Sequence, residues 1–424
     1  MSNVLFLTDR MTLTDPLLEP ELKSALSDSG LIASDMVRLH FCGVVSYGKK
    51  LAVFLPRNTP KEKRNIYSSA LLFKAIYRYY LTKDSGIKSE DIGDDVIGGS
   101  TLNLYSQLLQ DYQDYGLYIR RTKEKTINNG RVNWSRTIAR STLLPSDNGP
   151  VYLDLCTSRS RNDANNEITR IHASIIKQVI GKVGVLWLGV ESHFDETLAQ
   201  TPKTLMNKPS QITYLEKELR LTYSERDIVL IKNLLRFLKE TNDPNQNDMV
   251  IGTRFFHNMW ESLLDECLPH TESINSRLPL PVYHTQEEKF VPVAKKNQRL
   301  DTFLKSPDGQ HYAVIDAKYY DAQSPNSAPG WSDLVKQFFY VNAVREVVGF
   351  DAKVTNHFVF PGVEPKLKAA FVAHRSQTVT SLEDGLSGYP PIYCHYLCPI
   401  VLLEKYVNGL SLDRLAQKVL SSSK

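Results

Sequence analysis

The chain has 424 residues, enough for two or three folding units of ordinary size. Apolar residues make up 42% of it and charged residues 23%, with neither glycine nor proline in excess, which excludes collagen-like, disordered and disulfide-scaffold classes. The formal net charge is only +4, so a surface that binds nucleic acid must be local rather than spread over the whole chain.

The cysteine count and the first residues predict a soluble, cytoplasmic protein. Five cysteines are an odd number for so long a chain, and this is typical of reduced thiols rather than a disulfide framework. The apolar run at the start is too short for a signal peptide, and we expect no membrane-spanning segment elsewhere.

The first half of the sequence predicts a mixed α/β domain, which we place at residues 1–212. Residues 37–45 and 51–55 have the composition of two strands, joined by a glycine-containing connection of hairpin length. Helices are expected where apolar side chains recur at helical spacing, at residues 66–81, 102–115 and 168–188.

A basic segment at residues 119–140 interrupts this half. It holds seven Lys and Arg residues against the single acid Glu124, around the turn signal Asn128-Asn129-Gly130. Two interpretations stay open: a solvated hairpin or loop, or a contact for DNA phosphates or for an acidic partner surface. In the second interpretation the contact residues are Arg120, Arg121, Arg131 and Arg136.

The second half predicts another α/β domain, at residues 213–424. A helical lead-in is expected at 213–240, and the polar residues 241–248 have the composition of a surface loop that joins the two halves. The core, at about 251–360, is expected to have a mixed central sheet flanked by helices. Its helices are predicted at 254–267 and 332–348, and its strands at 281–284, 289–293, 299–305, 312–320 and 354–360.

Two of these strands bring acidic side chains together. The turn Ser306-Pro307-Asp308-Gly309 predicts that its two arms pair antiparallel. If Ser306 opposes Gly309, Asp301 opposes Val314 and lies diagonally across from Asp316 on one face. Lys318 shares that face because strand side chains alternate. Two carboxylates and an ammonium suit Mg²⁺-assisted phosphodiester hydrolysis, with Mn²⁺ as a substitute ion.

The same pattern also suits an amphipathic hairpin whose charged face is merely solvated. Neighbouring residues favour a functional site. Glu261 offers a third carboxylate from the preceding helix, and the main-chain carbonyl of Ala317 offers a further oxygen ligand. Gln337 and Tyr340, one turn apart on the following helix, are supporting candidates.

Asp301 followed by Asp316-Ala317-Lys318 resembles the PD-(D/E)xK nuclease motif, although Leu300 stands where the name-giving proline would be. The text from Ile315 to Tyr320 is similar to that of the McrC and LlaJI restriction families, as are Gly130-Arg131-Val132-Asn133-Trp134 and Phe54-Leu55-Pro56-Arg57. The resemblance implies that Asp301, Asp316 and Glu261 are metal ligands and that Lys318 orients the attacking water.

This resemblance implies an Mg²⁺-dependent endonuclease subunit of a restriction or phage-defence system. It would act on double-stranded DNA with an AAA+ GTPase motor of the McrB type, which the N-terminal half would contact, and could dimerise to cut both strands. Two alternatives remain: a non-catalytic adaptor that activates the motor, and a stand-alone DNA-repair nuclease.

Overall fold

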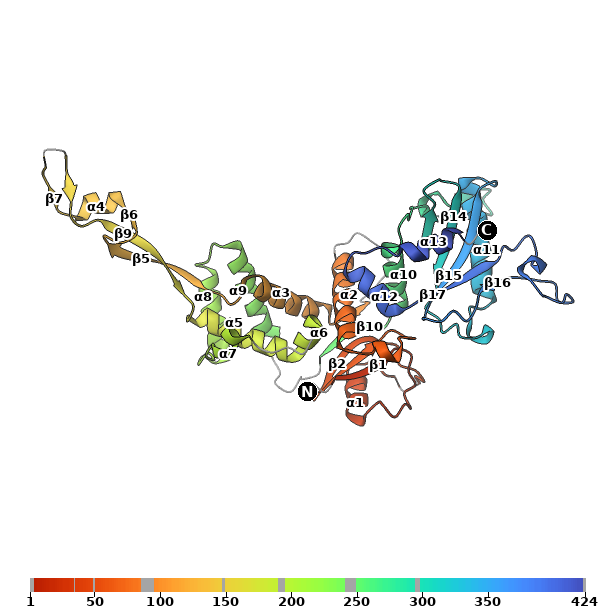
Figure 1. Ribbon diagram of the computed structural model, residues 1–424, viewed down its shortest axis with the longest axis horizontal. Coiled ribbons are helices and arrows are strands. Elements are labelled where there is room, and N and C mark those ends of the chain that lie inside the picture. Colours follow the sequence, from red (N-terminus) through yellow and green to blue (C-terminus); the bar gives the residue numbers. More distant parts are fainter. Residues whose placement is uncertain are drawn as a thin grey trace. The chain divides into compact units, whose positions relative to one another are not determined.

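The computed structural model describes residues 4–33, 35–48, 50–84, 95–146, 149–189, 195–240, 249–293 and 298–421. The chain forms two compact units (Figure 1): the first comprises residues 1–102, 185–191 and 246–424, and the second comprises residues 103–184 and 192–245. The units are thus not divided at residue 212, because the chain returns to the N-terminal sheet after the second unit. The predicted join at 241–248 lies outside the described residues.

The first unit begins with a five-stranded sheet, called here the N-terminal sheet, in the order β1-β3-β2-β10-β4. Its strands are β1 Val4–Thr8, β2 Cys42–Tyr47, β3 Lys50–Leu55, β4 Val96–Ile97 and β10 Val250–Thr253. The β2–β3 hairpin confirms the predicted pair of strands, although β2 begins five residues later than expected. A Cβ atom at Gly43 would lie 2.2 Å from the Ile251 carbonyl oxygen, so only glycine lets β10 approach β2.

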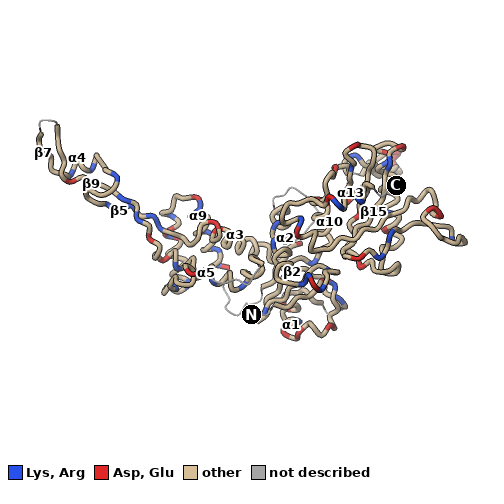
Figure 2. Tube along the Cα trace, viewed as in Figure 1, with Lys and Arg blue, Asp and Glu red and all other residues tan. Residues whose placement is uncertain are grey.

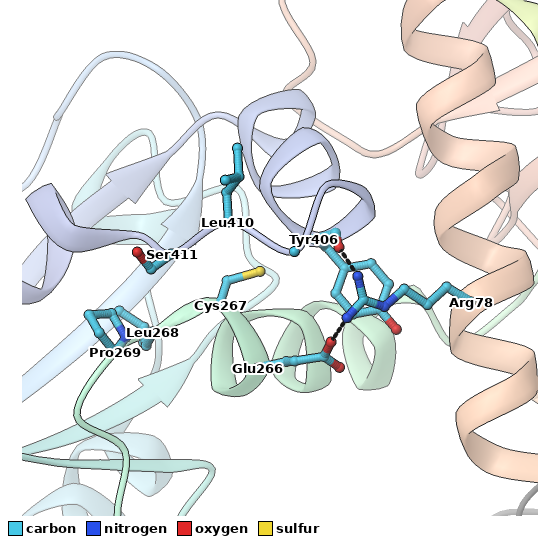
Figure 3. A pocket seen from close by; sticks show the side chains of 9 residues that line it. Arg78, Glu266, Cys267, Leu268, Pro269, Tyr406, Leu410 and Ser411 are labelled. Carbon is cyan, nitrogen blue, oxygen red and sulfur yellow. Dashed lines mark hydrogen bonds and ion pairs between the residues drawn. The ribbon is translucent and has the colours of Figure 1, made fainter.

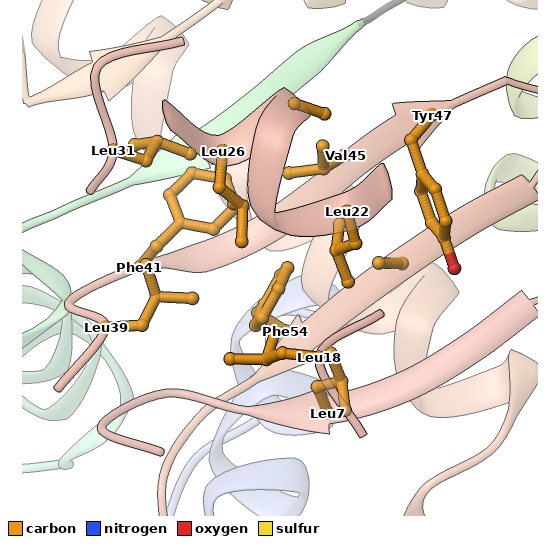
Figure 4. Packing of buried hydrophobic residues seen from close by; sticks show 12 residues of the cluster. Leu7, Leu18, Leu22, Leu26, Leu31, Leu39, Phe41, Val45, Tyr47 and Phe54 are labelled. Carbon is orange, nitrogen blue, oxygen red and sulfur yellow. The ribbon is translucent and has the colours of Figure 1, made fainter. Parts of the chain in front are cut away.

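Helix α1 (Pro20–Asp28) covers one face of the N-terminal sheet. Leu22 and Leu26 of this helix pack with Phe41 and Phe54, whose rings meet edge to face at 5.7 Å (Figure 4). The first unit further contains α2 (Ile66–Asp84), α6 (Val185–Leu188), α10 (Phe256–Cys267) and α12 (Pro399–Val407), with α2 packed against α6 and α12. The predicted helices at 66–81 and 254–267 are confirmed.

A second sheet of the first unit, called the site sheet, has the order β13-β14-β15-β17-β16. Its strands are β13 Thr302–Lys305, β14 His311–Ala317, β15 Lys353–Pro361, β16 Ala369–Ala370 and β17 Ile392–Leu397. The strands β14, β15 and β17 run parallel, whereas the two edge pairs are antiparallel. Helix α11 (Trp331–Val348) buries Val341 and Val344 against Val314 of β14. The predicted α/β class, with a mixed sheet flanked by helices, is confirmed.

The remaining elements of the first unit are helix α13 (Asp413–Ser421), which packs against β14 and β15, and a small ribbon of β11 (Val282–His284) and β12 (Phe290–Pro292). The β11 and β12 strands confirm the predicted strands at 281–284 and 289–293. Both lie in exposed chain, with the rings of His284 and Phe290 stacked at 4.4 Å.

The second unit contains a helical body with most of α3 (Gly99–Tyr115), α5 (Glu167–Val179), α7 (Glu196–Gln200), α8 (Lys208–Leu219) and α9 (Glu225–Glu240). The helical lead-in predicted at 213–240 is present as two helices, because α8 ends at Leu219 and Ser224 starts α9 by accepting the Asp227 N–H at 3.5 Å. The helix predicted at 168–188 also differs, since a π-helical turn at Ile180–Gly184 separates α5 from α6.

An extended arm, residues 119–163, projects from this helical body (Figure 1). Strand β5 (Arg120–Ile127) pairs along its length with β9 (Cys156–Asp163), and β6 (Arg131–Val132) pairs with the other side of β9. The arm also carries α4 (Trp134–Arg140) and the short strands β7 (Leu143–Leu144) and β8 (Val151–Tyr152). The basic segment is therefore a ribbon, but its partner strand is β9, which sequence periodicity did not indicate.

The helical run Glu167–Leu188 is the one stretch among the described residues that is long and apolar enough to cross a membrane, contrary to the expectation that there is none. Of its most apolar window, 56% is buried inside the protein, as in the core helix of a soluble protein. The cytoplasmic location stays a prediction.

Candidate active site

The β13–β14 hairpin sets the position of the acidic residues. Thr302 pairs with Ile315, and the Ser306 N–H donates to the His311 carbonyl at 2.8 Å. Continuing this register places Asp301 opposite Asp316, so the predicted diagonal arrangement is wrong by two residues. The loop is longer than predicted because Ser306 Oγ accepts the His311 N–H at 2.9 Å. A shift of two keeps each side chain on its predicted face.

Asp301 and Asp316 face each other at the end of this hairpin. Asp301 Oδ2 accepts the Ala317 N–H at 3.0 Å, and its carboxyl is hydrogen-bonded to that of Asp316, which is buried. Burial raises the pKa of Asp301 well above its usual range, and the charges of Asp316 and Glu261 raise it further. Asp301 is therefore harder to ionise than an exposed aspartate.

Lys318 supplies the cation nearest to this pair. Its Nζ lies 3.0 Å from Asp316 Oδ2 and 3.0 Å from Asp333 Oδ1. Burial by itself would lower the pKa of Lys318, but the two carboxylates outweigh burial and raise it above the usual lysine value. Strand β14 ends at Ala317, one residue before Lys318. The Lys318 N–H donates to the Val359 carbonyl at 3.1 Å. The ammonium is therefore charged and held from two sides.

Glu261 approaches the cluster from α10. Burial raises the pKa of Glu261 to about 7, the charge of Asp316 raises it too, and Lys318 and Arg299 partly offset the rise. On α11, burial raises the pKa of Tyr340, with Asp301 and Asp316 as the next causes. Glu261 and Tyr340 thus lie close enough to the acid pair for its charge to raise their pKa values.

Gln337, the other supporting candidate, is fully buried on α11. Neither its Oε1 nor its Nε2 has a hydrogen-bond partner among the described residues. A buried amide without partners raises the free energy of the folded chain. Packing alone therefore does not explain a glutamine at this position.

Asp333 is the residue that sequence reasoning missed. It lies in the first turn of α11 and holds Lys318 together with Asp316, while the Tyr320 hydroxyl donates to its Oδ2 at 3.2 Å. A signal was present, because Asp333 precedes Gln337 by four residues and so shares its helix face.

The donor chemistry of this cluster fits a divalent cation. Among the described residues, no group of three His, Cys, Asp or Glu side chains is arranged as a metal-binding set. The two aspartates nevertheless offer hard oxygen ligands, and a cation would offset the negative charge that raises the pKa of Asp301. Asp301, Asp316, Glu261 and the Ala317 carbonyl therefore fit Mg²⁺ by chemistry, and their ligand roles stay predictions.

The four arginines proposed as DNA or partner contacts all lie on the arm, where Lys and Arg are concentrated (Figure 2). Arg120 differs from the other three because it donates to Glu218 at 2.8 Å, an acid that is buried. Arg121 and Arg131 are exposed, and Arg136 sits on α4, where Asn133 caps the helix by accepting the Arg136 N–H at 3.1 Å.

A separate hollow of about 190 Å³ lies between α2, α10 and α12 (Figure 3). Arg78 donates to Glu266 and to the Tyr406 carbonyl, and its guanidinium lies 4.6 Å from the centre of the Tyr406 ring. Burial raises the pKa of the adjoining Cys267 to about 11, so this thiol is not a ready nucleophile. Arg78 and Glu266 pair with each other, and neither belongs to the acidic cluster.

The mixed sheet and its buried acid pair define an α/β protein with an acidic, lysine-containing site at the end of a central strand. A model of the LlaJI restriction endonuclease family matches residues 41–373, and the chain belongs to this family. This confirms the resemblance to the LlaJI family that the sequence indicated. The chain is 23% identical over 359 residues to the Type II restriction enzyme BsuMI component YdjA of Bacillus subtilis (strain 168), a match that covers 79% of this chain and 76% of that protein.

Solved structures that align with the chain include two from Thermococcus gammatolerans. An assembly of McrB AAA+ hexamers with bound McrC contains a chain that is 10% identical, with a TM-score of 0.40, covering 98% of this chain and 100% of that one. A McrBC complex gives 10% identity and a TM-score of 0.22, covering 56% of this chain and 80% of that one.

Proposed function

We propose that this restriction endonuclease family member is a Mg²⁺-dependent endodeoxyribonuclease subunit that hydrolyses phosphodiester bonds of double-stranded DNA by PD-(D/E)xK chemistry. The observation that carries the proposal is the contact of Asp301 with Asp316 on one hairpin, with Lys318 held 3.0 Å from Asp316. Mn²⁺ is expected to substitute for Mg²⁺.

Each residue of the cluster has a role in this proposal. Asp301, Asp316, Glu261 and the Ala317 carbonyl would hold Mg²⁺, which when bound supplies a Lewis acid for the phosphate and lowers the pKa of its water. Lys318 stays charged between two carboxylates, so it donates a hydrogen bond that orients the attacking water rather than removing its proton. Water is the nucleophile, and no covalent enzyme intermediate forms.

The proposed setting is a multi-subunit restriction or phage-defence system. The BsuMI relative is named as one component of a restriction enzyme, which supports a role as one subunit among several. We propose an AAA+ GTPase of the McrB type as the motor, contacted by the N-terminal half, and dimerisation for cutting both strands. The proposal of a motor rests on the likeness of the sequence to the McrC and LlaJI families.

The test compares the parent chain with Asp316→Asn and Lys318→Ala, each mixed with the partner subunits, supercoiled plasmid DNA and Mg²⁺. Loss of a positioned acid–base or electrostatic group is expected to slow cleavage by about 10²–10⁴-fold. Lys305→Ala is the matched control, because Lys305 is an exposed lysine on the same hairpin. Chelation of the metal is expected to stop cleavage by the parent.

Other outcomes point to the alternatives. Equal cleavage by parent and both variants would contradict the nuclease site. If the parent never cuts but still stimulates GTP hydrolysis by the motor, the chain is an adaptor. If the parent cuts without any partner subunit, it is a stand-alone nuclease.

A further inference from the structure

The N-terminal sheet and the site sheet meet at Tyr319, the residue directly after Lys318. Tyr319 is buried, and its ring packs against Phe256 and Trp260 of α10 at centroid distances of 5.2 and 6.0 Å. The Tyr320 N–H donates to the Lys318 carbonyl at 2.8 Å, so Lys318 and Tyr319 belong to one tight turn of the backbone. Whatever fixes Tyr319 therefore fixes the backbone from which Lys318 extends.

The Tyr319 hydroxyl is held by the N-terminal sheet. It accepts the Arg57 N–H at 2.7 Å and lies 3.8 Å from Cys42 Sγ, and the carboxyl of Asp9 is buried nearby. Asp9 in turn accepts the Phe41 N–H at 3.0 Å. These partners lie more than 250 residues before Tyr319 in the chain, so tertiary contact rather than sequence proximity joins them to it.

The Arg57 side chain holds the same residue a second time. Its Nη1 donates to the Tyr319 carbonyl at 3.2 Å, its guanidinium lies 5.8 Å from the centre of the Tyr319 ring, and its Nη2 lies 3.9 Å from Asp321. The next residue, Asn58, donates to the Pro361 carbonyl at the end of β15 at 2.9 Å. Asn58 has a φ of +59°, so the loop adopts a left-handed turn at the point of contact.

We propose that Arg57 and Tyr319 form a positioning clamp through which the N-terminal sheet fixes Lys318 between Asp316 and Asp333. The clamp rests on the proposed nuclease function, in which Lys318 orients water. It gives a role to the segment Pro56-Arg57-Asn58, which takes no direct part in the proposed hydrolysis. Neither clamp residue touches the acidic cluster directly. Both are positioning residues, because they act through the backbone of Lys318.

Packing alone does not account for the arrangement. A phenylalanine would fill the space between Phe256 and Trp260 equally well, whereas a buried tyrosine hydroxyl is retained here with polar partners from the other sheet. A shift of about 1 Å in the placement of Lys318 is enough to disturb a catalytic hydrogen bond.

The test uses Tyr319→Phe, which keeps the ring, and Arg57→Ala, which keeps the main-chain donor but removes the guanidinium. Tyr47→Phe is the matched control for the first, because Tyr47 is a buried tyrosine of the same N-terminal sheet whose hydroxyl bonds Glu19. Arg64→Ala is the control for the second, because Arg64 lies in the same loop and bonds Thr59.

The first measurement is the acetylation rate of the Lys318 amine by an N-hydroxysuccinimide acetate, followed by mass spectrometry on the full chain. A released Lys318 loses its two carboxylate partners and reacts faster, so both clamp variants are expected to label several-fold faster than the parent and the controls. The exposed Lys305 provides the internal reference and should label equally in all variants.

The second measurement is plasmid cleavage with Mg²⁺ and the partner subunits. The clamp variants are expected to lose about tenfold in kcat with an unchanged KM for DNA, as for a misplaced catalytic group. Labelling and cleavage equal to the parent in both clamp variants would overturn the proposal. If the parent itself does not cleave, the nuclease function fails, whereas the labelling rates still decide whether the clamp positions Lys318.

Discussion

Charged side chains are used in opposite ways in the site sheet and in the arm. In the site sheet, Asp301, Asp316 and Lys318 are close together and largely removed from solvent, and the charge of Asp316 raises the pKa of both Asp301 and Lys318. On the arm, residues 119–163 carry nine Lys and Arg against four Asp and Glu, and most described members are exposed. The contacts between its charged side chains therefore identify the chemistry of the site sheet, whereas only net charge characterises the arm.

The difference sets what each region can do. Buried charges act on a substrate at short range and with fixed geometry, because little water screens them. Exposed arginines act over longer distances and lose strength as salt is added. Removing charge from one region at a time therefore shows whether its effect is local and geometric or diffuse and salt-dependent.

After Asp316→Asn and Lys318→Ala, the largest effect is expected for Asp333→Asn. This substitution removes one of the two carboxylates that hold the Lys318 ammonium, so the amine gains freedom to leave Asp316. Cleavage of plasmid DNA in the presence of Mg²⁺ is expected to fall by about 10–100-fold. Asp308→Asn, on the exposed hairpin turn, is the matched control and should cut at the parent rate. Parent-like cleavage by Asp333→Asn would show that Asp316 alone holds Lys318.

The next effect concerns Mg²⁺ and the stability of the folded chain. Because a bound cation would offset the negative charge that surrounds Asp301, Mg²⁺ is expected to raise the Tm of the parent by about 2–5 °C in a thermal unfolding scan at about pH 8. Asp301→Asn and Asp316→Asn should lose this shift. A shift that survives in both variants would place the ion elsewhere.

The pH dependence of stability in metal-free protein follows from Glu261. Its pKa is about 7 in the folded chain, so between its ordinary value of 4.5 and 7 the folded chain binds a proton that the unfolded chain has lost. The free energy of unfolding therefore falls as pH rises through this window. Denaturant titrations of Glu261→Gln, which cannot ionise, should give a flatter profile, whereas the exposed Glu287→Gln should keep the parent slope.

Local sequence patterns predicted most elements of the site but not its full membership. Alternation along β13 and β14 keeps Asp301 and Asp316 on one face as long as the register shifts by an even number of residues. The turn residues did not specify that loop length, since the Ser306 side chain extends it. Asp333 was missed because its role depends on how α11 docks on the sheet, which periodicity does not reveal.

Contacts between distant segments were beyond the reach of sequence patterns. Strand β10 completes the N-terminal sheet some 200 residues after β2, and β9 pairs with β5 across an intervening helix and turn. The hydrogen bond from Arg57 to Tyr319 is of the same kind. Each depends on tertiary packing, for which the sequence offers no local period.

The smallest effects are expected on the arm, where Arg120 and Arg121 are neighbours with different surroundings. Arg121→Ala, alone or with Arg131→Ala and Arg136→Ala, should weaken non-specific binding to double-stranded DNA. The salt slope of that binding should fall by about one for each phosphate that is no longer neutralised. The Tm should not change for Arg121→Ala or Arg131→Ala, because both side chains are exposed.

Arg120→Ala is expected to lower stability rather than DNA binding, because it leaves the buried Glu218 without its partner. It should cost about 1 kcal/mol of unfolding free energy, since the guanidinium is itself about one-third exposed, and should change DNA binding little. Adding Glu218→Gln should recover most of that stability. If Arg120→Ala instead weakens DNA binding as Arg121→Ala does, the ion pair opens when the arm is occupied, and the division between buried and exposed charge does not hold there.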